Sequence, residues 1–474
     1  MTPNAITPTR AQDFPEWYQQ VIRAADLAES SPVRGCMTIK PNGYAIWEGL
    51  QAAFDREIKA MGVRNAYFPL LIPLSYFSRE AQHVDGFAKE CAVVTHHRLE
   101  AGPDGGLQPA APLEEPLVVR PTSEMIIGDA MARWVQSYRD LPLKLNQWAN
   151  VMRWEMRPRL FLRTSEFLWQ EGHNAFATAD EADADARAVL DMYVRVAREV
   201  LALPSIPGRK TEDETFPGAE VTYTFEMMMQ DGKALQSGTS HHMGQNFARS
   251  CGIKYQDKDG REQYAHTTSW GVSSRLIGAL IMTHADDDGL VLPPRIAPEQ
   301  VAILPITKSP DAALTEHCQA LAEQLRAAGI RAEVDARDMR TPDKIWGALK
   351  RGVPLRVEIG GREAAAGTVT HVRRDLGRGS KATAPVQHFL GAARGLLDEV
   401  QQNLLARAEQ RLRENTHDTE DLDGFFAHGT GFARAPASVL QDPSFTEVKK
   451  RHGVTPRCMP FADGGESVII ARAY

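Results

Sequence analysis

The stretch VMRWEMRPRLFLRTSEFLWQEGH, residues 151–173, decides the fold class of this chain. Arg153 and Glu155 stand two residues apart, so on a strand both side chains point to one face. The fork of an arginine donates along two edges, to a phosphate and a carboxylate at once, while Glu155 can accept from an exocyclic amine. Arg163 is a second candidate phosphate ligand, and Phe167 can stack on a base. A salt-bridged hairpin is the alternative, but the arginines concentrated around apolar strand residues favour a binding site.

Two other segments offer groups suited to an amino acid and a nucleotide. In RPTSE, residues 120–124, Thr122 and Glu124 can clamp an ammonium group by charge-assisted hydrogen bonds. A loop that caps a helix over 124–135 is the simpler alternative. In LQSGTSHHMGQNF, residues 235–247, polar side chains stand at alternate or near-alternate positions beside a glycine: Gln236, Thr239 and His241. The adjacent histidines of this segment face opposite ways on a strand, which disfavours a shared metal ion.

The last informative segment is SWGVSSR, residues 269–275. Ser269, Gly271 and Ser273 lie on one strand face, and a helix begins near Arg275, which can reach a phosphate or lie across an adenine ring. The run 286–288, three aspartates before a glycine, is at first sight a Mg²⁺ site, but a solvated turn is the better interpretation.

Size and composition narrow the class of protein. At 474 residues the chain predicts two or three domains. It has no apolar run of about 20 residues and no secretory signal pattern at its N-terminus. Its five cysteines are widely spaced and form no CxxC pair, which favours a reducing cytoplasm. The net charge of −7 means that any contact with nucleic acid relies on local basic patches.

The first 290 residues mix helices and strands. Apolar residues every four positions predict a helix over 45–61, followed by a strand over 65–73. Residues 99–115, rich in Gly and Pro, predict a loop. Thr178 and Glu181 form a capping box that starts a long helix.

Beyond the proline cluster 292–298 the pattern changes to strand-helix alternation. Strands are predicted over 301–306, 331–334 and 355–359, with helices around 314–325 and over 342–351. This order indicates a small α/β domain with a mixed sheet. A charged helix over 392–414 leads into a final module that ends at Tyr474.

Taken together, these segments resemble the class II aminoacyl-tRNA synthetases, and within them the archaeal/eukaryotic-type prolyl-tRNA synthetases. Arg153-Trp-Glu155 is similar to the second motif of the class, residues 271–275 to the third, and Phe68-Pro69 to the first, at the dimer interface. Further similarity covers EAQHVDGFAKE (80–90) and GVPLRVEIG (352–360). The resemblance extends over nearly the whole chain, in order.

The resemblance implies a proline–tRNA ligase that makes prolyl-adenylate from L-proline and ATP and transfers prolyl to tRNA(Pro). It implies proline contacts by Thr122, Glu124, Arg153, Trp169, His173, His241, Ser269 and Gly271. It implies ATP contacts by Arg153, Glu155, Arg163, Thr164, Phe167, Gln236, Thr239, Ser273 and Arg275, with Mg²⁺ on the phosphates. Arg153 and Arg275 carry the catalytic charge neutralisation.

The resemblance also implies an antiparallel catalytic sheet flanked by helices (residues 1–295), a small α/β anticodon-binding domain (296–397), a C-terminal α/β module (398–474) and a homodimer. Basic residues expected to meet tRNA are Lys344, Lys350, Arg351, Arg356, Arg373, Arg374, Arg378 and Lys381. Tyr474 is expected to dock near the active-site cleft.

Two departures from the family are visible. The interval between Arg163 and Arg275 is too short for the large editing insertion of bacterial-type enzymes. Of the four zinc cysteines common in the C-terminal module only Cys458 is present, so we expect no structural zinc and no metal held by cysteines. The alternatives are a class II enzyme for threonine, histidine or glycine, and an inactive paralogue that binds tRNA or an amino acid without charging. The missing zinc ligands argue against threonine, and the retained Arg153, Glu155 and Arg275 against inactivity.

Overall fold

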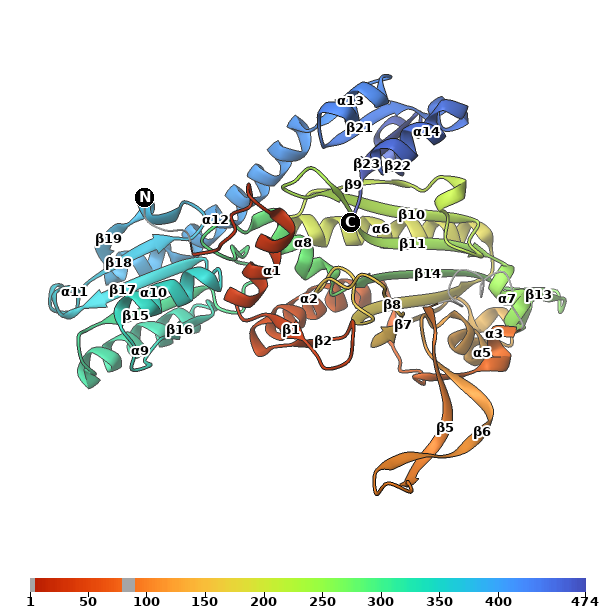
Figure 1. Cartoon of the computed structure of the whole chain (residues 1–474), viewed down its shortest axis with the longest axis horizontal. Coiled ribbons are helices and arrows are strands. Elements are labelled where there is room, and N and C mark those ends of the chain that lie inside the picture. The colour runs from red at the N-terminus through yellow and green to blue at the C-terminus, as the bar shows by residue number, and fades with distance from the viewer. Residues whose placement is uncertain (1–4, 79–89) are drawn as a thin grey trace.

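A computed structural model describes residues 5–78 and 90–474. The segment 80–90 lies outside the described residues except for Glu90. Figure 1 shows a central body around a long sheet, a separate α/β unit at one end and the C-terminal part above the body. Among the helices of the described ranges, none combines the length and apolar character that a membrane crossing needs.

The body is built on an antiparallel sheet, as predicted. Its central strands are hydrogen-bonded in the order β9-β10-β11-β14-β8-β7, every pair antiparallel, and β3 adds a parallel edge. The bounds are β3 (Arg64–Asn65), β7 (Leu143–Met152), β8 (Glu166–Phe176), β9 (Ile206–Arg209), β10 (Val221–Met228), β11 (Ala234–Gly244) and β14 (His266–Ser273).

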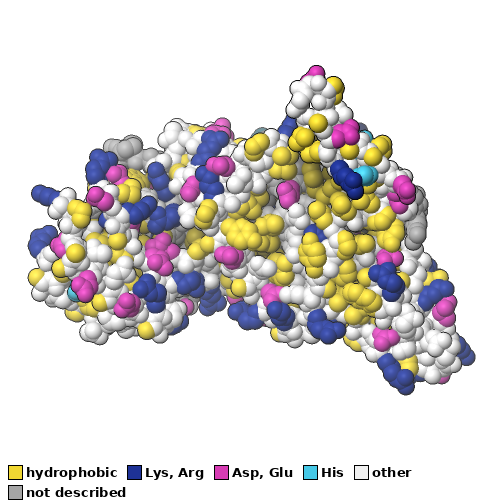
Figure 2. Space-filling model, turned by 90° about the horizontal axis from the view of Figure 1, so that it is seen from below, with side chains coloured by type: hydrophobic (Ala, Val, Ile, Leu, Met, Phe, Trp, Pro, Cys, Tyr) yellow, Lys and Arg dark blue, Asp and Glu magenta, His cyan; other side chains and the backbone are white. Residues whose placement is uncertain are grey.

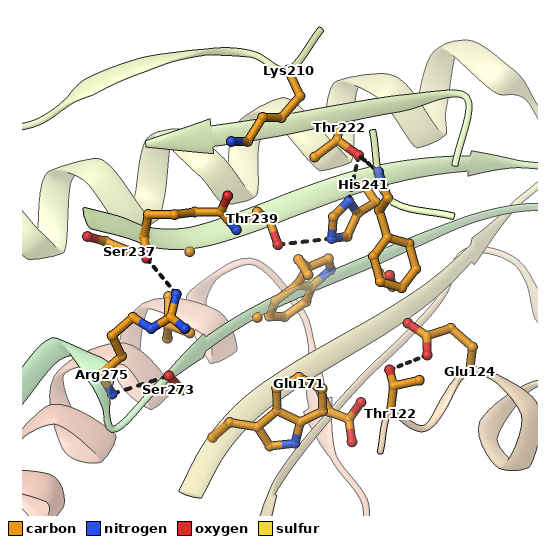
Figure 3. Close-up of a pocket in the computed structure, with 18 of the residues that line it drawn as sticks. Thr122, Glu124, Glu171, Lys210, Thr222, Ser237, Thr239, His241, Ser273 and Arg275 are labelled. Carbon is orange, nitrogen blue, oxygen red and sulfur yellow. Dashed lines mark hydrogen bonds between the residues drawn. The ribbon is translucent and has the colours of Figure 1, made fainter. Parts of the chain in front are cut away.

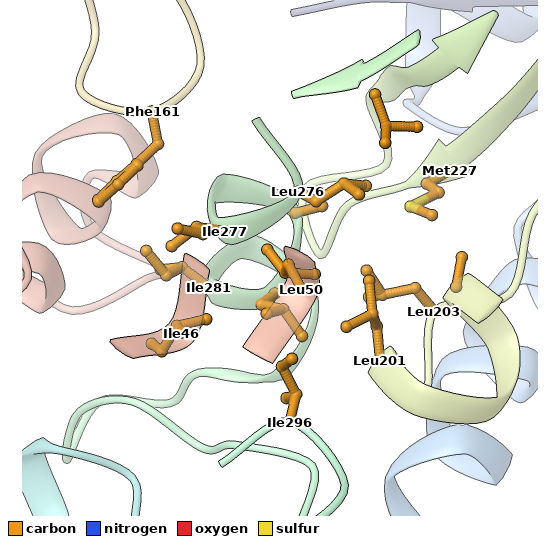
Figure 4. Packing of buried hydrophobic residues seen from close by; sticks show 14 of the residues in the cluster. Ile46, Leu50, Phe161, Leu201, Leu203, Met227, Leu276, Ile277, Ile281 and Ile296 are labelled. Atoms are coloured by element: carbon orange, nitrogen blue, oxygen red, sulfur yellow. The ribbon is translucent and has the colours of Figure 1, made fainter. Parts of the chain in front are cut away.

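Helices cover this sheet and fill the main core. Predicted from residue 45, α2 (Pro41–Ala60) begins four residues earlier, with a proline in its first turn. The capping box of Thr178 and Glu181 starts α6 (Ala179–Leu201), as predicted. Figure 4 shows Ile46 and Leu50 of α2 packed beside Ile277 and Ile281 of α8 (Arg275–His284). Other elements of the body are α1 (Phe14–Ala24), β1 (Ala28–Ser30), β2 (Met37–Ile39), α3 (Leu74–Ser78), α5 (Glu124–Trp134), α7 (Asn246–Cys251), β12 (Lys254–Gln256) and β13 (Glu262–Tyr264).

The strand predicted over 65–73 is interrupted. Only β3 and β4 (Leu71–Pro73) pair with neighbours, and the chain between them forms no ladder. Pro69 has no N–H to donate, and the N–H of Phe68 is bound by the Gln147 side chain at 3.1 Å. The apolar run therefore reflects the burial of Phe68 rather than a continuous strand.

The loop predicted over 99–115 is wrong. β5 (Ala92–Ala101) and β6 (Leu107–Val119) form a long hairpin that projects from the body (Figure 1). Its outer part is exposed on both faces, so the alternation that marks a half-buried strand is missing. Pro109 and Pro112 sit on this outer part, where β6 pairs with β5 alone, and an edge position tolerates proline.

The unit beyond residue 300 is a small α/β fold with a mixed sheet, as predicted. The strand order is β16-β15-β17-β18-β19, with β15 parallel to both neighbours and the β17–β18 and β18–β19 pairs antiparallel. The bounds are β15 (Val301–Ile306), α9 (Ala312–Ala327), β16 (Ala332–Val334), α10 (Thr341–Lys350), β17 (Leu355–Gly360), α11 (Gly361–Ala366), β18 (Thr368–Arg373) and β19 (Ala382–Pro385).

The C-terminal part is joined to the body through the sheet itself. Helix α12 (Val386–Glu414) links it to the α/β unit, and β22 pairs with β9, so one sheet of eleven strands runs through both parts. The hydrophobic core of this part includes Phe426, Val468 and Ile470, all of them buried. The bounds are β20 (Thr416–Asp418), α13 (Leu422–His428), β21 (Phe432–Pro436), α14 (Pro443–His452), β22 (Val454–Pro460) and β23 (Ser467–Arg472).

Tyr474 docks on the body instead of fraying. Its main-chain N–H donates to the Ala234 carbonyl at 3.0 Å, and its hydroxyl donates to Asp231 Oδ2 at 2.5 Å. Burial, together with the Asp231 carboxylate, raises the pKa of the tyrosine hydroxyl. The terminus is thus fixed at the first residue of β11, two residues before Gln236.

Candidate active site

One cavity of about 340 Å³ opens over the central strands and brings together most of the predicted site residues. Figure 3 shows Thr122, Glu124 and His241 toward one end and Ser273 and Arg275 toward the other. The predicted residues that line the cavity are Thr122, Glu124, Arg153, Phe167, Trp169, His173, Gln236, Thr239, His241, Ser269, Gly271, Ser273 and Arg275. Four segments far apart in the sequence therefore form one site.

Glu155, Arg163 and Thr164 are not among the residues that line the cavity. The strand predicted to carry Arg153 and Glu155 ends at Met152, so Glu155 leaves the sheet and its carboxylate accepts from the Arg157 N–H at 3.0 Å. Arg163 lies 3.9 Å from Glu155, and Thr164 is buried, donating to the Glu166 carbonyl. The binding roles implied for these residues stay predictions.

Carboxylates occupy the end of the cavity near Glu124. The Thr122 hydroxyl donates to the Glu124 carboxylate. His173 Nε2 lies 2.9 Å from Glu171 Oε2, while Glu171 Oε1 accepts from Gln147 Nε2 at 2.6 Å. Burial by itself lowers the pKa of His173, but the hydrogen bond and charge of Glu171, together with the charge of Glu124, raise it above its usual value. These two carboxylates suit a cationic group of a ligand.

His241 is held in a fixed orientation beside this end. Its Nδ1 lies 2.9 Å from the Thr222 hydroxyl and its Nε2 lies 2.9 Å from the Thr239 hydroxyl. The Phe216 ring packs against it at an angle of 33°, with ring centroids 4.5 Å apart. Burial lowers the pKa of His241 to about 4, so the imidazole is neutral at pH 7. It therefore acts as one donor and one acceptor, without charge.

Arg153 directly follows the end of β7 and lines the cavity. Its Nε donates to the Pro121 carbonyl at 2.9 Å, which fixes the plane of the guanidinium. The guanidinium carbon lies 5.7 Å from the Phe167 ring centroid and 5.6 Å from that of Trp169. Burial lowers the pKa of Arg153, and the carboxylates of Glu124, Glu90 and Glu171 oppose this. A guanidinium so placed remains charged and suits an anionic ligand.

Arg275 occupies the opposite end, at the first residue of α8 as predicted. It donates to the carbonyls of Leu162 and Gln236, each at 3.2 Å. A bulge in β11, opposite residues 225 and 226 of β10, changes the register at Ser237. Because of this extra residue, Gln236 and Thr239 both reach the cavity although they stand three positions apart. Burial and the neighbouring Arg163 and Arg153 lower the pKa of Arg275 to about 10.

The arrangement can bind a ligand that is cationic at one end and anionic further along. Glu124 and Glu171 face the first part, and Arg153 and Arg275 the second. A reaction that joins a carboxylate to a phosphate requires two anions to approach each other. Cations placed in this way can screen the repulsion between them.

Sequence reasoning missed the wall made by residues 210–222. Lys210, Phe216, Pro217 and Thr222 line the cavity, but no motif drew attention to them. Lys210 is 4% exposed, which is unusual for a lysine, and no local pattern in the sequence marks it as buried. Glycine is required at 238 by packing, because a Cβ there would lie 2.6 Å from Val272 Cγ1.

The aspartate run and the histidines form no metal site in the part of the chain described. Asp286 pairs with Arg374, and the Asp287 carboxylate accepts from the N–H of Arg10. Among the described ranges, no group of three or more His, Cys, Asp or Glu side chains is placed to hold a metal ion.

The basic residues of the α/β unit are largely engaged within the molecule. Arg374 is buried in its pair with Asp286, Arg351 contacts Glu299, and Arg373 contacts Asp375 and Glu399. Arg356 and Lys381 share Glu358. The side chains of Arg356 and Glu358 are mostly buried and that of Lys381 is exposed, so these cations are partly neutralised by the protein.

Comparisons with known proteins agree with this geometry. Residues 109–284 match the family model described as the tRNA synthetase class II core domain (G, H, P, S and T). Residues 300–394 match the model described as an anticodon binding domain.

Curated relatives are similar over nearly their full length. A proline–tRNA ligase from Bdellovibrio bacteriovorus is 53% identical, with 97% of this chain and 95% of the relative covered. One from Paramagnetospirillum magneticum is 52% identical, with 98% and 95% covered.

A solved structure shares the whole architecture. The prolyl-tRNA synthetase of Cryptosporidium parvum in complex with halofuginone and AMPPNP superposes with a TM-score of 0.89 at 35% identity, covering 99% of both chains. The complex of that enzyme with L-proline and AMP gives a TM-score of 0.88 at 34% identity, with the same coverage.

Proposed function

Because the chain belongs to the prolyl-tRNA synthetase family of class II, we infer that its cavity is where L-proline is activated and passed to tRNA. The protein is a proline–tRNA ligase: it joins proline and ATP into prolyl-adenylate, releases diphosphate and transfers prolyl to the 3′ end of tRNA(Pro). One observation supports the placement of the chemistry. The anionic Glu124 and the cationic Arg153 and Arg275 all line one cavity, with Glu124 toward one end and Arg275 toward the other.

Proline fits the end of the cavity near Glu124. We propose that Glu124 and Thr122 hold the imino group by charge-assisted hydrogen bonds, and that Arg153 binds the carboxylate. Trp169, His173, His241, Ser269 and Gly271 then surround the ring. The close packing of this wall supports the assignment: a Cβ on Gly271 would lie 3.0 Å from the Gln170 carbonyl oxygen.

ATP fits the remaining length. We propose that Phe167 and Arg275 enclose the adenine and that Arg153 bridges the proline carboxylate and the α-phosphate. Gln236, Thr239 and Ser273 complete the nucleotide contacts, with Glu155 at the adenine amine and Arg163 and Thr164 nearby. Reaction then needs the two anions held within bonding reach, and Arg153 neutralises both while they approach. Positioning and charge neutralisation can supply most of the acceleration, without a general base.

We propose that Mg²⁺ accompanies ATP and is held mainly by phosphate oxygens and water, the ligands that this small, hard cation keeps. When bound, it would neutralise charge on the phosphates.

We propose the archaeal/eukaryotic subtype, with domains at 1–295, 296–397 and 398–474. Support comes from the interval between Arg163 and Arg275, which is occupied by α6, α7 and strands β8 to β14 of the body.

We propose that the C-terminal module folds without zinc. Cys458 is buried, its sulfur lies 3.8 Å from the Ile206 carbonyl oxygen, and burial raises its thiol pKa, which opposes the thiolate that zinc requires. Stoichiometric zinc in purified protein, measured by elemental analysis, would contradict this.

We propose a homodimer through the face formed by α2, β3, β4 and α5. Tyr67 is 73% exposed and Trp134 is 49% exposed, and Tyr44, Leu71 and Leu74 are also exposed. Figure 2 shows apolar side chains gathered on the middle of the catalytic part of one face. Exposed patches of this kind mark interfaces. Light scattering at micromolar concentration should give twice the mass of the chain, and a monomer would contradict the proposal.

The α/β unit, by its match to an anticodon-binding family, supports tRNA(Pro) as the partner and the cytoplasm as the place of action. The direct test is aminoacylation: the purified chain with ATP, labelled proline and tRNA(Pro) should form acid-precipitable prolyl-tRNA. Omission of ATP or replacement of proline by alanine should prevent it.

A further inference from the structure

Three charged side chains are buried where the C-terminal strand β22 meets the wall of the cavity. Lys210 is 4% exposed, Glu226 is 0% exposed and Arg457 is 7% exposed. Lys210 directly follows β9, Glu226 lies on β10, and Arg457 comes from β22, more than two hundred residues later in the chain. Met459 and Pro460 pair with Arg209 and Gly208, so the β22–β9 ladder brings Arg457 and Lys210 together.

The contacts form a chain from the C-terminal module to the cavity. Arg457 Nε and Nη2 both donate to Glu226 Oε2, at 3.1 and 2.9 Å. The other carboxylate oxygen lies 3.3 Å from Lys210 Nζ and accepts from the Thr224 hydroxyl at 3.2 Å. Glu226 is therefore fixed on one side by Arg457 and fixes Lys210 on the other.

Lys210 has donor capacity left over, and it lines the cavity. An ammonium has three protons, yet Lys210 Nζ forms no hydrogen bond within the described residues. Figure 3 shows its side chain reaching from above toward the end where Ser237 and Arg275 lie. A buried ammonium group that faces a polar cavity, and whose protons have no acceptor in the described part of the chain, is suited to bind an acceptor atom of a ligand.

The excess of positive charge around Glu226 also favours the binding of an anion. Lys210, Arg457 and Arg275 bring three positive charges near the buried carboxylate of Glu226, and Glu214 is a further carboxylate among the residues that line the cavity with Lys210. The Glu226 carboxylate raises the pKa of Arg275, but burial and the neighbouring arginines outweigh it, so the net effect is a lowered pKa. Buried cations in excess are costly unless a counter-charge arrives, and the proposed use of the site brings one in ATP.

We propose that Lys210 binds the terminal phosphates of ATP and the leaving diphosphate, and that Arg457 positions it through Glu226. This rests on proline activation in the cavity, as proposed above. In that step an oxygen of the proline carboxylate bonds to the α-phosphorus. The bond from that phosphorus to the oxygen bridging to the β-phosphorus breaks, and its electron pair leaves on diphosphate. The ammonium of Lys210 stabilises that growing charge.

Because strand β22 of the C-terminal module supplies Arg457, ATP use depends on the docking of this module and not only on the catalytic core. Gly208 allows the close approach, since a Cβ there would lie 2.3 Å from the Met459 carbonyl oxygen.

The test compares full-length variants in proline-dependent ATP–diphosphate exchange. Lys210→Met should raise the KM for ATP or lower kcat by about tenfold or more, while the KM for proline changes less than about twofold. Lys210→Arg should recover part of the loss, and Lys254→Met, at an exposed pair with Glu262, should match wild type. Prolyl transfer from preformed prolyl-adenylate to tRNA should be unchanged in Lys210→Met, because diphosphate has already left.

The positioning role is tested by Arg457. Arg457→Met should shift the ATP parameters in the same direction, and adding it to Lys210→Met should cause no further loss, since both act through one contact. Arg434→Met, on β21 of the same module, is the control. If thermal melting shows Arg457→Met to be unfolded, Arg457→Lys, which keeps the charge but not the fork, is measured instead and should give an intermediate ATP effect.

The outcomes separate the two proposals. Absence of exchange with proline in wild type overturns the function itself. Normal wild-type exchange with unchanged Lys210→Met overturns only the role of Lys210. A Lys210→Met loss confined to the transfer step would instead place Lys210 at the tRNA end, and additive effects of the two substitutions would overturn the role of Arg457.

Discussion

Arg374 of the anticodon-binding domain binds Asp286, two residues beyond α8, with both arms of its guanidinium: Nη1 donates to Oδ2 at 2.7 Å and Nη2 donates to Oδ1 at 2.6 Å. Arg374 is buried, with 3% of its side chain exposed, and Asp286 is 36% exposed. This pair explains two features of the sequence at once. The first aspartate of the run 286–288 is a structural partner, and Arg374, one of the basic residues expected to meet tRNA, is engaged with it inside the molecule.

Removal of this contact should loosen the two domains. Asp286→Asn leaves the Arg374 guanidinium buried without its counter-charge, and we expect a loss of about 2 kcal/mol in the free energy of unfolding. The value is below that of wholly buried pairs because Asp286 is partly exposed. Urea denaturation measures it, with Asp418→Asn as a control at an exposed pair with Arg434. An Asp286→Asn midpoint equal to that of wild type would contradict the assignment.

Because Arg153 is proposed to neutralise two anions, its removal should cause a large loss of activity. Arg153→Ala should reduce proline-dependent exchange to below about a tenth of wild type, a barrier increase of more than about 1.4 kcal/mol, with an unchanged melting temperature. Arg195→Ala, at the surface pair with Glu57, is the matched control. Retention of more than a tenth of the activity in Arg153→Ala would rule out the bridging role.

The sequence allowed much of this site to be predicted because its motifs are local. Strand alternation placed Ser269, Gly271 and Ser273 on one face, and the helix start placed Arg275. The hairpin of β5 and β6 could not be predicted, since strands exposed on both faces carry no alternation. Nor could the contact of Arg457 with Glu226 be predicted, because a pair between residues 231 positions apart has no signature in either segment.

Buried His284 should make stability depend on pH. Burial, assisted by the nearby Arg411 and Arg407, lowers its pKa to about 3, whereas the unfolded value is about 6.5. Between these two pKa values His284 is protonated in the unfolded chain but neutral in the folded protein. The free energy of unfolding therefore falls as pH drops below about 6.5, by up to about 1.4 kcal/mol per pH unit. His284→Gln should show a shallower decline between about pH 6 and 4.

Urea denaturation at each pH measures this decline. His428→Gln, on the exposed end of α13, should keep the slope of wild type. A His284→Gln slope as steep as that of wild type would show that other groups cause the acid sensitivity.

Contact with tRNA should be the salt-sensitive part of the reaction. Phosphate contacts release counterions, so charging should fall by about tenfold or more between 50 and 200 mM salt, while exchange changes by less than about twofold. Arg356 and Lys381 are partly neutralised by Glu358, so Glu358→Gln should strengthen binding of tRNA(Pro) and leave exchange unchanged. An equal fall of charging and exchange with salt would contradict a separate tRNA surface.

The central claim is that the cavity selects proline and activates it with ATP. Its most direct measurement is ATP–diphosphate exchange by wild-type protein without tRNA, with proline, threonine, histidine, glycine, serine and alanine supplied in turn. We predict that proline drives exchange at least about a hundredfold more efficiently, in kcat/KM, than any other amino acid of the series. Exchange driven by another of these amino acids, with none driven by proline, would contradict the account.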